Sequence, residues 1–128
     1  MKTLTAFARP SVGPVETAMS WTKDGIAEIQ RVLERFPGTD GRSNDSYRYL
    51  RVKLHAYTRL RRELRSLSHL GRTALLRALR DFRFDPKDAQ GEGEDVLSLV
   101  REKVTQVVLV LKSFLAGGGP LPDPTWTV

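Results

Sequence analysis

The sequence predicts an all-α fold: a compact bundle of about four helices, with an extended N-terminal arm and a short Pro-containing C-terminal tail. Apolar residues recur at helical spacing in several segments of the 128-residue chain, and Pro and Gly separate these segments. The hydrophobic fraction of 40% is enough for one modest core, and the length fits one domain. We therefore assign residues 1–16 to the arm, 17–116 to a single helical domain and 117–128 to the tail.

The first helix is expected to begin near Ser20 or Thr22, because either hydroxyl can cap a helix N-terminus. Apolar residues follow at helical spacing, at Ile26, Ile29, Leu33 and Phe36. The breakers of PGTDG, residues 37–41, end this helix. Residues 1–16 contain Pro10, Gly13 and Pro14 without any periodicity, which is why they are interpreted as an arm.

The second helix is expected to start at Ser43–Ser46, where Asp45 suits both capping and the helix dipole, and to run to about Leu70. Gly71 indicates a break, because an unbroken helix from 45 to 84 would be about 60 Å long, too long for a compact domain of this size. Thr73 can cap a shorter third helix that ends before Asp85-Pro86.

The last helix, about 95–116, is the most apolar segment, and we expect the other three helices to pack around it. Its β-branched run VVLVL would suit a buried strand if taken alone, but the length and the helical spacing on both sides favour a helix. The breakers GGGP end it. In the tail, Trp126 is expected either to cover the core or to anchor a partner.

The positive charge of the chain is concentrated in one region. The net charge is +6 and the sequence pI is about 10.1, values typical of nucleic-acid-binding domains and also suited to acidic proteins or anionic membranes. Residues 44–84 contain eleven Lys or Arg and three Asp or Glu, a net charge of +8, so the rest of the chain sums to −2. This local excess indicates a basic surface.

A helical wheel of the second helix separates its charged and apolar residues. One arc of roughly 120° contains the arginine face, namely Arg48, Arg51, His55, Arg59, Arg62, Arg65 and His69. The opposite side carries the expected core residues Leu50, Tyr57, Leu60, Leu64 and Leu67. Our candidate nucleic-acid-binding residues are Arg48, Arg51, Arg59, Arg62 and Arg65, continued by Arg72, Arg80 and Arg83, with Tyr47 and Tyr49 to stack on bases.

Three interpretations of the arginine face compete. It could bind nucleic-acid phosphates, with RNA favoured because of the tyrosines. It could dock on an acidic protein surface or an anionic membrane, as an adaptor or inhibitor, and this alternative includes homo-oligomers formed through an exposed leucine stripe. It could also be a solvated face neutralised by the acids of residues 85–95. The Arg- and Leu-rich, Cys-free composition resembles that of viral accessory proteins.

Lys53 interrupts the apolar arc of the second helix, beside Tyr49 and Tyr57. A lysine is rarely buried without a partner. We expect it to extend its ammonium group to solvent or to pair with an acid on the first or last helix, such as Glu28, Glu34 or Glu102. A role in a pocket is the less favoured alternative.

The sequence contains no signature of an enzyme. The chain has no Cys, its two histidines lack metal-site spacing, and no nucleophile or phosphate-loop motif occurs. We therefore expect a non-enzymatic protein without cofactor or metal. No apolar run is long enough to span a bilayer, so a cytoplasmic or nuclear location is expected, and the N-terminus is only faintly like an organelle transit peptide.

Overall fold

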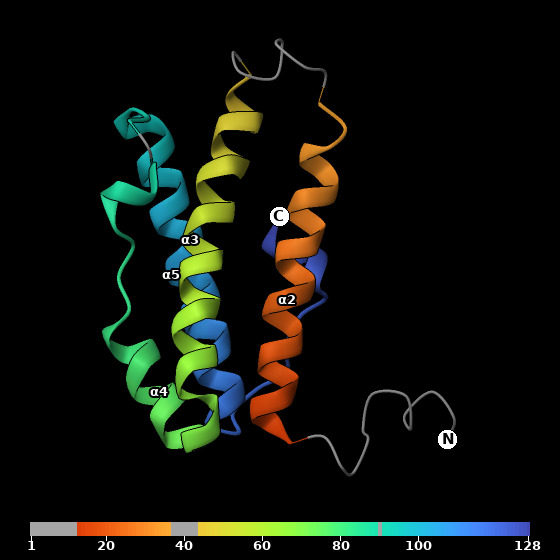
Figure 1. The fold of residues 1–128 in the computed structure, drawn as a ribbon, viewed down its shortest axis with the longest axis vertical. Coiled ribbons are helices and arrows are strands. Elements are labelled where there is room, and N and C mark those ends of the chain that lie inside the picture. The colour runs from red at the N-terminus through yellow and green to blue at the C-terminus, as the bar shows by residue number, and fades with distance from the viewer. Residues whose placement is uncertain (1–12, 37–43, 90) are drawn as a thin grey trace.

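The computed structural model describes residues 13–36, 44–89 and 91–128, and these residues form an all-α four-helix bundle (Figure 1). The helices are α2 (Pro14–Leu33), α3 (Asp45–Leu67), α4 (Arg72–Asp81) and α5 (Glu94–Leu115). Three short 3₁₀ turns follow α3, α4 and α5, namely η2 (Ser68–Leu70), η3 (Pro86–Ala89) and η4 (Pro124–Thr127). The predicted fold class is confirmed, whereas residues 1–12 of the predicted arm lie outside the described residues.

Helix α2 begins at Pro14, so the prediction of a start near Ser20 or Thr22 was wrong. Gly13 is the N-cap in an extended conformation, Pro14 occupies the first turn, and Glu16 places negative charge near the helix N-terminus. Pro is unfavourable inside a helix but favourable in its first turn, where its missing N–H has no intrahelical partner to lose. Pro14 therefore begins the helix instead of ending a non-helical segment.

Helix α3 starts and ends close to the predicted positions. The Asn44 side chain caps it by accepting hydrogen bonds from the backbone N–H groups of Ser46 at 2.8 Å and Tyr47 at 3.3 Å. The chain breaks at Gly71, whose φ of 93° is in the region that favours glycine, as the sequence predicted. Helix α4 then starts at Arg72 with Gly71 as its N-cap, so the expected cap at Thr73 was wrong.

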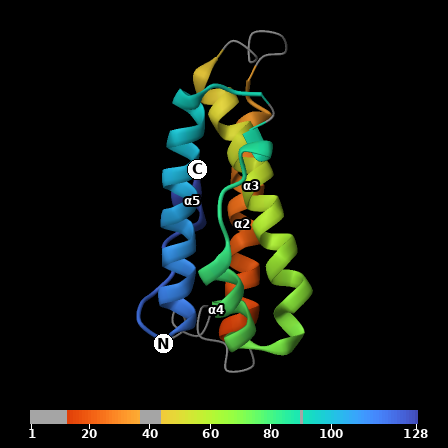
Figure 2. The ribbon, with the colours of Figure 1, turned by 90° about the vertical axis from the view of Figure 1, so that its left-hand side faces the viewer.

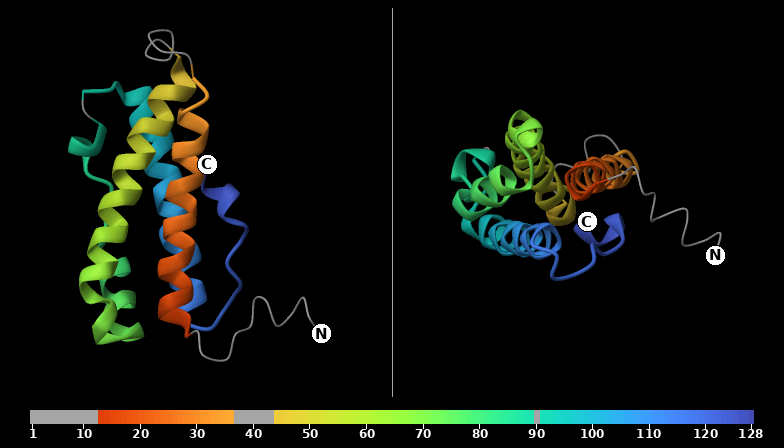
Figure 3. Two further views of the ribbon diagram at one scale, coloured as in Figure 1. Left: turned by 45° about the vertical axis from the view of Figure 1, so that its right-hand side comes forward. Right: turned by 90° about the horizontal axis from the view of Figure 1, so that it is seen from below.

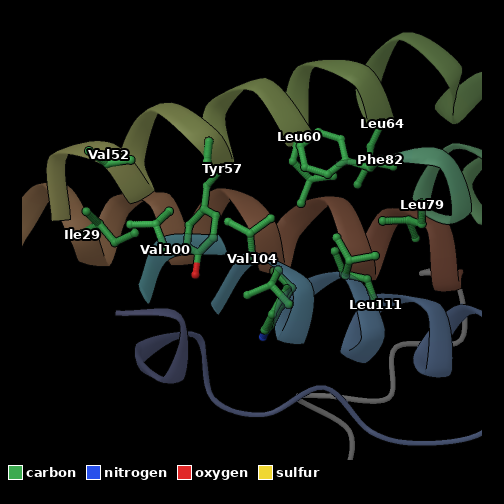
Figure 4. Close-up of a cluster of buried hydrophobic side chains, with 14 of the residues drawn as sticks. Ile29, Val52, Tyr57, Leu60, Leu64, Leu79, Phe82, Val100, Val104 and Leu111 are labelled. Carbon is green, nitrogen blue, oxygen red and sulfur yellow. The ribbon is translucent and has the colours of Figure 1, made fainter. Parts of the chain in front are cut away.

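The core lies between the four helices, and Figure 4 shows side chains from all of them meeting there. Helix α3 contributes the predicted Leu50, Tyr57, Leu60 and Leu64, all buried, while Leu67 is only partly buried. The VVLVL run is helical, and α5 buries residues on more than one side because it contacts α2, α3 and α4. No helix in the described ranges has the length and hydropathy required to cross a membrane.

The segment after α5 returns along the bundle and packs between α5 and α2 (Figure 3). The indole Nε1 of Trp21 donates to the Pro122 carbonyl at 2.7 Å, and the Trp126 ring lies 6.4 Å from that of Trp21. Thr127 is only 2% exposed, against Gly25 of α2. Of the two predicted roles of Trp126, the structure shows the one in which it covers the core.

Candidate functional site

Two arginines of the predicted face are held by the acidic segment between α4 and α5, which crosses the bundle beside α3 in Figure 2. Arg59 donates from Nε to Asp88 Oδ2 at 3.1 Å and from Nη2 to the same carboxylate at 3.0 Å. Its Nη2 also donates to the Arg83 carbonyl at 2.8 Å, and its guanidinium lies 4.4 Å from the centroid of the Phe82 ring. Arg59 therefore fastens the segment to α3.

Arg48 is paired in a similar way near the N-terminus of α3. It forms ion pairs with Asp45 of its own helix and with Glu92, the latter at 3.5 Å. Asp88 and Glu92 belong to residues 85–95. The acids of this segment are the ones expected to neutralise the arginine face if it is only a solvated face. For Arg48 and Arg59 the structure agrees with that interpretation, since their guanidinium groups are occupied by carboxylates of the same chain.

The next two arginines of the face, Arg62 and Arg65, line a groove between α2 and α3. The groove has two adjoining hollows of about 380 and 410 Å³ that share Arg61 and Arg65. Ile26 and Gln30 of α2 line the first hollow. Among the described residues that line either hollow, Glu16 is the only one with a carboxylate, and it lies at the end nearer the α2 N-terminus. We call this feature the α2–α3 groove.

Arg61 is the site residue that the wheel missed, because it lies at the border of the apolar arc. Its Nε atom is shielded from solvent and has no hydrogen-bond partner among the described residues. Within the described part of the chain, Arg61, Arg62 and Arg65 make no ion pair with a carboxylate. The spacing Arg61–Arg65–His69, one helical turn at each step, was the signal that could have identified this stripe.

The two candidate stacking tyrosines already contact other side chains. The Tyr47 ring meets Phe36 edge-on with centroids 5.4 Å apart, and the Arg51 guanidinium lies 5.9 Å from its centroid. Tyr49 is partly buried, and the ammonium group of Lys53 lies 4.5 Å from its ring centroid. Burial raises the pKa of the Tyr49 hydroxyl above its usual value, with a smaller contribution from Glu102.

The candidate arginines beyond Gly71 lie apart from the α2–α3 groove. Arg72 is exposed at the start of α4. Arg80 pairs with Asp81 at 3.1 Å, and Arg83 donates to the carbonyls of Arg80 and Phe82, both at 2.8 Å. Arg80 and Arg83 line a second groove, between α4 and α5. The predicted surface therefore separates into arginines paired with carboxylates of the chain, two grooves, and Arg72, which lines neither groove.

Lys53 is fully buried and has none of the partners that we expected. Its Nζ donates to the main-chain oxygen of Val128 at 2.5 Å. Among the described residues it neither reaches solvent nor pairs with Glu28, Glu34 or Glu102. Burial, and then the nearby charge of Lys103, lower the pKa of Lys53 to about 7. Together with the hydrogen bond from Tyr57 Oη to the Thr127 carbonyl at 3.0 Å, it holds the C-terminal segment on the bundle.

Nothing in the described residues resembles a metal centre, since no three His, Cys, Asp or Glu side chains come together there. His55 on α3 and His69 on η2 are both exposed. Searches of protein-family profiles, of curated proteins and of solved structures find no significant match to this chain. The chemistry of the two grooves is therefore the basis for a functional proposal.

Proposed function

We propose that the protein binds nucleic acid through the phosphate backbone, without catalysing a reaction, and that the α2–α3 groove is the contact surface. The observation that supports this proposal is the contrast between the arginines of α3. Arg48 and Arg59 are neutralised by carboxylates of the same chain, whereas Arg61, Arg62 and Arg65 line a groove without such a pair among the described residues. A guanidinium group that lacks an internal partner keeps its charge and its donors for an external phosphate.

The spacing of these arginines suits a chain of phosphates. Arg61 and Arg65 are one helical turn apart, about 6 Å along the axis, with Arg62 between them. A polyanion lying along the groove can thus meet three guanidinium groups in succession, with the apolar Ile26 beside them. Phosphate contacts of this kind position a nucleic acid without reading its bases.

The proposal changes one sequence-based expectation, the preference for RNA. That preference depended on Tyr47 and Tyr49 as stacking platforms, and both rings already contact neighbouring side chains. Backbone contacts alone do not distinguish RNA from DNA, so single strands of either kind are expected to bind with similar affinity. With this activity we expect the protein to act in the cytoplasm or the nucleus, where nucleic acid is present.

The test is fluorescence anisotropy with labelled 20-nucleotide RNA, DNA and duplex across a salt series. Three phosphate contacts predict a slope of about −2 for log affinity against log salt on a single strand, or a loss of roughly 20-fold between 50 and 200 mM salt. The variant Arg61→Gln/Arg62→Gln/Arg65→Gln should lose nearly all of this slope. The matched control Lys23→Gln/Arg77→Gln/Lys87→Gln removes the same charge at exposed positions outside the groove and should retain most of the binding.

Three results would contradict the proposal. Equal losses in the two triple variants would mean that overall charge, and not the groove, binds the polyanion. Absence of binding at 20 mM salt would exclude a phosphate-backbone site. Tighter binding to vesicles containing phosphatidylserine than to any oligonucleotide would favour the membrane-surface alternative instead.

A further inference from the structure

The second groove lies between α4 and α5 and has several apolar side chains in its lining. It encloses about 400 Å³, and α4 and the segment that follows it lie along α5 in Figure 2. The partly buried Phe84 and the exposed Leu109 line it, above the buried side chains of Phe82 and Val108. Leu109 is 56% exposed. Leu99 has the same exposure, and these two are the most exposed large apolar side chains of α5.

The rim of this groove is positively charged. Arg80, which already pairs with Asp81, and Arg83 line it from the α4 side, and Arg101 and Lys112 line it from α5. No carboxylate belongs to its lining among the described residues. Arg101 lies 5.7 Å from the Phe84 ring centroid and 3.6 Å from Glu94, which is itself exposed. The groove therefore combines an apolar centre with four cationic side chains around it.

The length of the groove decides between possible ligands. Residues 101–112 of α5 line it, and these cover about 16 Å at 1.5 Å per residue, or three helical turns. A single small anionic group cannot reach cations at both ends of that distance. A nucleic-acid backbone would gain little from Leu109 and Phe84, because its phosphates offer no apolar surface to them. An amphipathic helix with acidic flanks matches both the apolar centre and the charged rim.

We propose that the α4–α5 groove is a docking site for an acidic amphipathic helix of a partner protein. Leucine-type side chains of the partner pack on Leu109 and Phe84, and its carboxylates pair with Arg83, Arg101 and Lys112, while Arg80 keeps its pair with Asp81. This site is separate from the α2–α3 groove, since the two share no lining residue. The protein would thus join a nucleic acid to a protein partner.

The probe is a synthetic 18-residue helical peptide with leucines at i, i+3, i+7 and i+10 and glutamates on both flanks. Two matched peptides carry Gln or Lys in place of every Glu. In anisotropy titrations at 50 mM salt we expect the Glu peptide to bind at least tenfold more tightly than the Gln peptide, and the Lys peptide not to bind.

Two variants that each replace an exposed leucine of α5 with glutamate locate the site. Leu109→Glu places a carboxylate on the groove floor and should weaken the Glu peptide at least tenfold, whereas Leu99→Glu should leave its affinity unchanged. Leu99 has the same 56% exposure on the same helix but lies outside the α4–α5 groove. Both side chains are exposed, so both variants should fold, which circular dichroism would verify. The swap Arg101→Glu/Lys112→Glu should transfer binding to the Lys peptide.

The following outcomes would overturn the proposal. One is equal affinity for the Glu and Gln peptides, or no binding of the Glu peptide at 1 mM. A second is equal weakening by Leu109→Glu and Leu99→Glu. A third is loss of oligonucleotide affinity in Leu109→Glu, which would assign the groove to nucleic acid. A fourth is self-association that sedimentation detects in the wild type and not in Leu109→Glu, which would assign it to a second copy of the chain.

Discussion

Replacing Lys53 with Met should make the stability of the protein less dependent on pH. The wild-type side chain is fully buried, and its Nζ has one hydrogen bond, to the main-chain oxygen of Val128. It pairs with no Asp or Glu side chain among the described residues, and the Tyr49 ring, 4.5 Å from its ammonium group, compensates only part of the cost of burying the charge. Met has a similar length and no charge, so it tests the cost of the ammonium group directly.

The direction of the pH effect follows from the proton balance. In the unfolded chain the pKa of Lys53 returns to its ordinary 10.5, whereas burial lowers it to about 7 in the folded protein. Between these values the unfolded state binds more protons, so the free energy of unfolding rises with pH. The slope approaches about 1.4 kcal/mol per pH unit, which gives about 2–3 kcal/mol between pH 7.5 and 9.5. Lys103, whose pKa burial also lowers, acts in the same direction.

The Met variant lacks the Lys53 contribution to this slope. At pH 7.5 we expect it to be more stable than the wild type by about 2 kcal/mol, because a lost hydrogen bond of about 1 kcal/mol offsets only part of the relieved burial cost. The difference should shrink towards zero by about pH 9.5. Urea unfolding followed by tryptophan fluorescence at pH 7.5, 8.5 and 9.5 measures it, with the exposed Lys87→Met as the matched control.

A constant difference between Lys53→Met and the wild type across this pH range would refute the reasoning, because it would mean that Lys53 keeps an ordinary pKa in the folded protein. The reasoning would also be refuted if the stability difference between Lys87→Met and the wild type changed with pH as much as that of Lys53→Met. A Met variant that is less stable at every pH would show that the contact with Val128, and not the burial of the amine, dominates its energetics.

Three further predictions concern other contacts and are tested by urea unfolding. Arg59→Gln removes a bidentate ion pair and should lower the free energy of unfolding by about 1–3 kcal/mol. Arg62→Gln should change it by no more than about 0.5 kcal/mol. Equal effects of the two variants would contradict the division of the arginine face. Asn44→Ala removes the cap of α3 and should cost about 1 kcal/mol, and no loss would mean that the cap is dispensable. Gly25→Ala would bring a Cβ to 2.8 Å from Thr127 Oγ1 and should destabilise the protein. Adding Thr127→Ala should relieve this destabilisation. If the losses of the two single variants simply add in the double variant, the clash is excluded.

The sequence predicted those features of the fold that depend on neighbours along the chain. The apolar stripe of α3 and the break at Gly71 follow from periodicity and from the conformational freedom of glycine, and both are confirmed. The helical state of VVLVL followed from the length of its segment. The start of α2 was wrong for a local reason, because Pro14 serves as a first-turn residue as well as a breaker.

The features that the sequence did not predict depend on segments far apart in the chain. The partner of Lys53 is Val128, 75 residues away, and the partner of Trp21 is the Pro122 carbonyl, 101 residues away. A main-chain carbonyl carries no side-chain signal, so a search for acidic partners could not find either contact. Gly25 likewise shows its role only when Thr127 lies against it.

The division of the arginine face shows why a helical wheel alone cannot identify a binding site. A wheel gives the direction in which each side chain leaves its own helix, but the use of a guanidinium group depends on what lies beside it. Arg59 and Arg62 are less than one turn apart on α3, and the helical wheel places both in the arginine face. Asp88 occupies the first, whereas the second lines the groove beside α2. The net charge of +8 in residues 44–84 therefore overstates the charge available to a ligand, and the arginines without an internal carboxylate are the better guide to a candidate anion-binding surface.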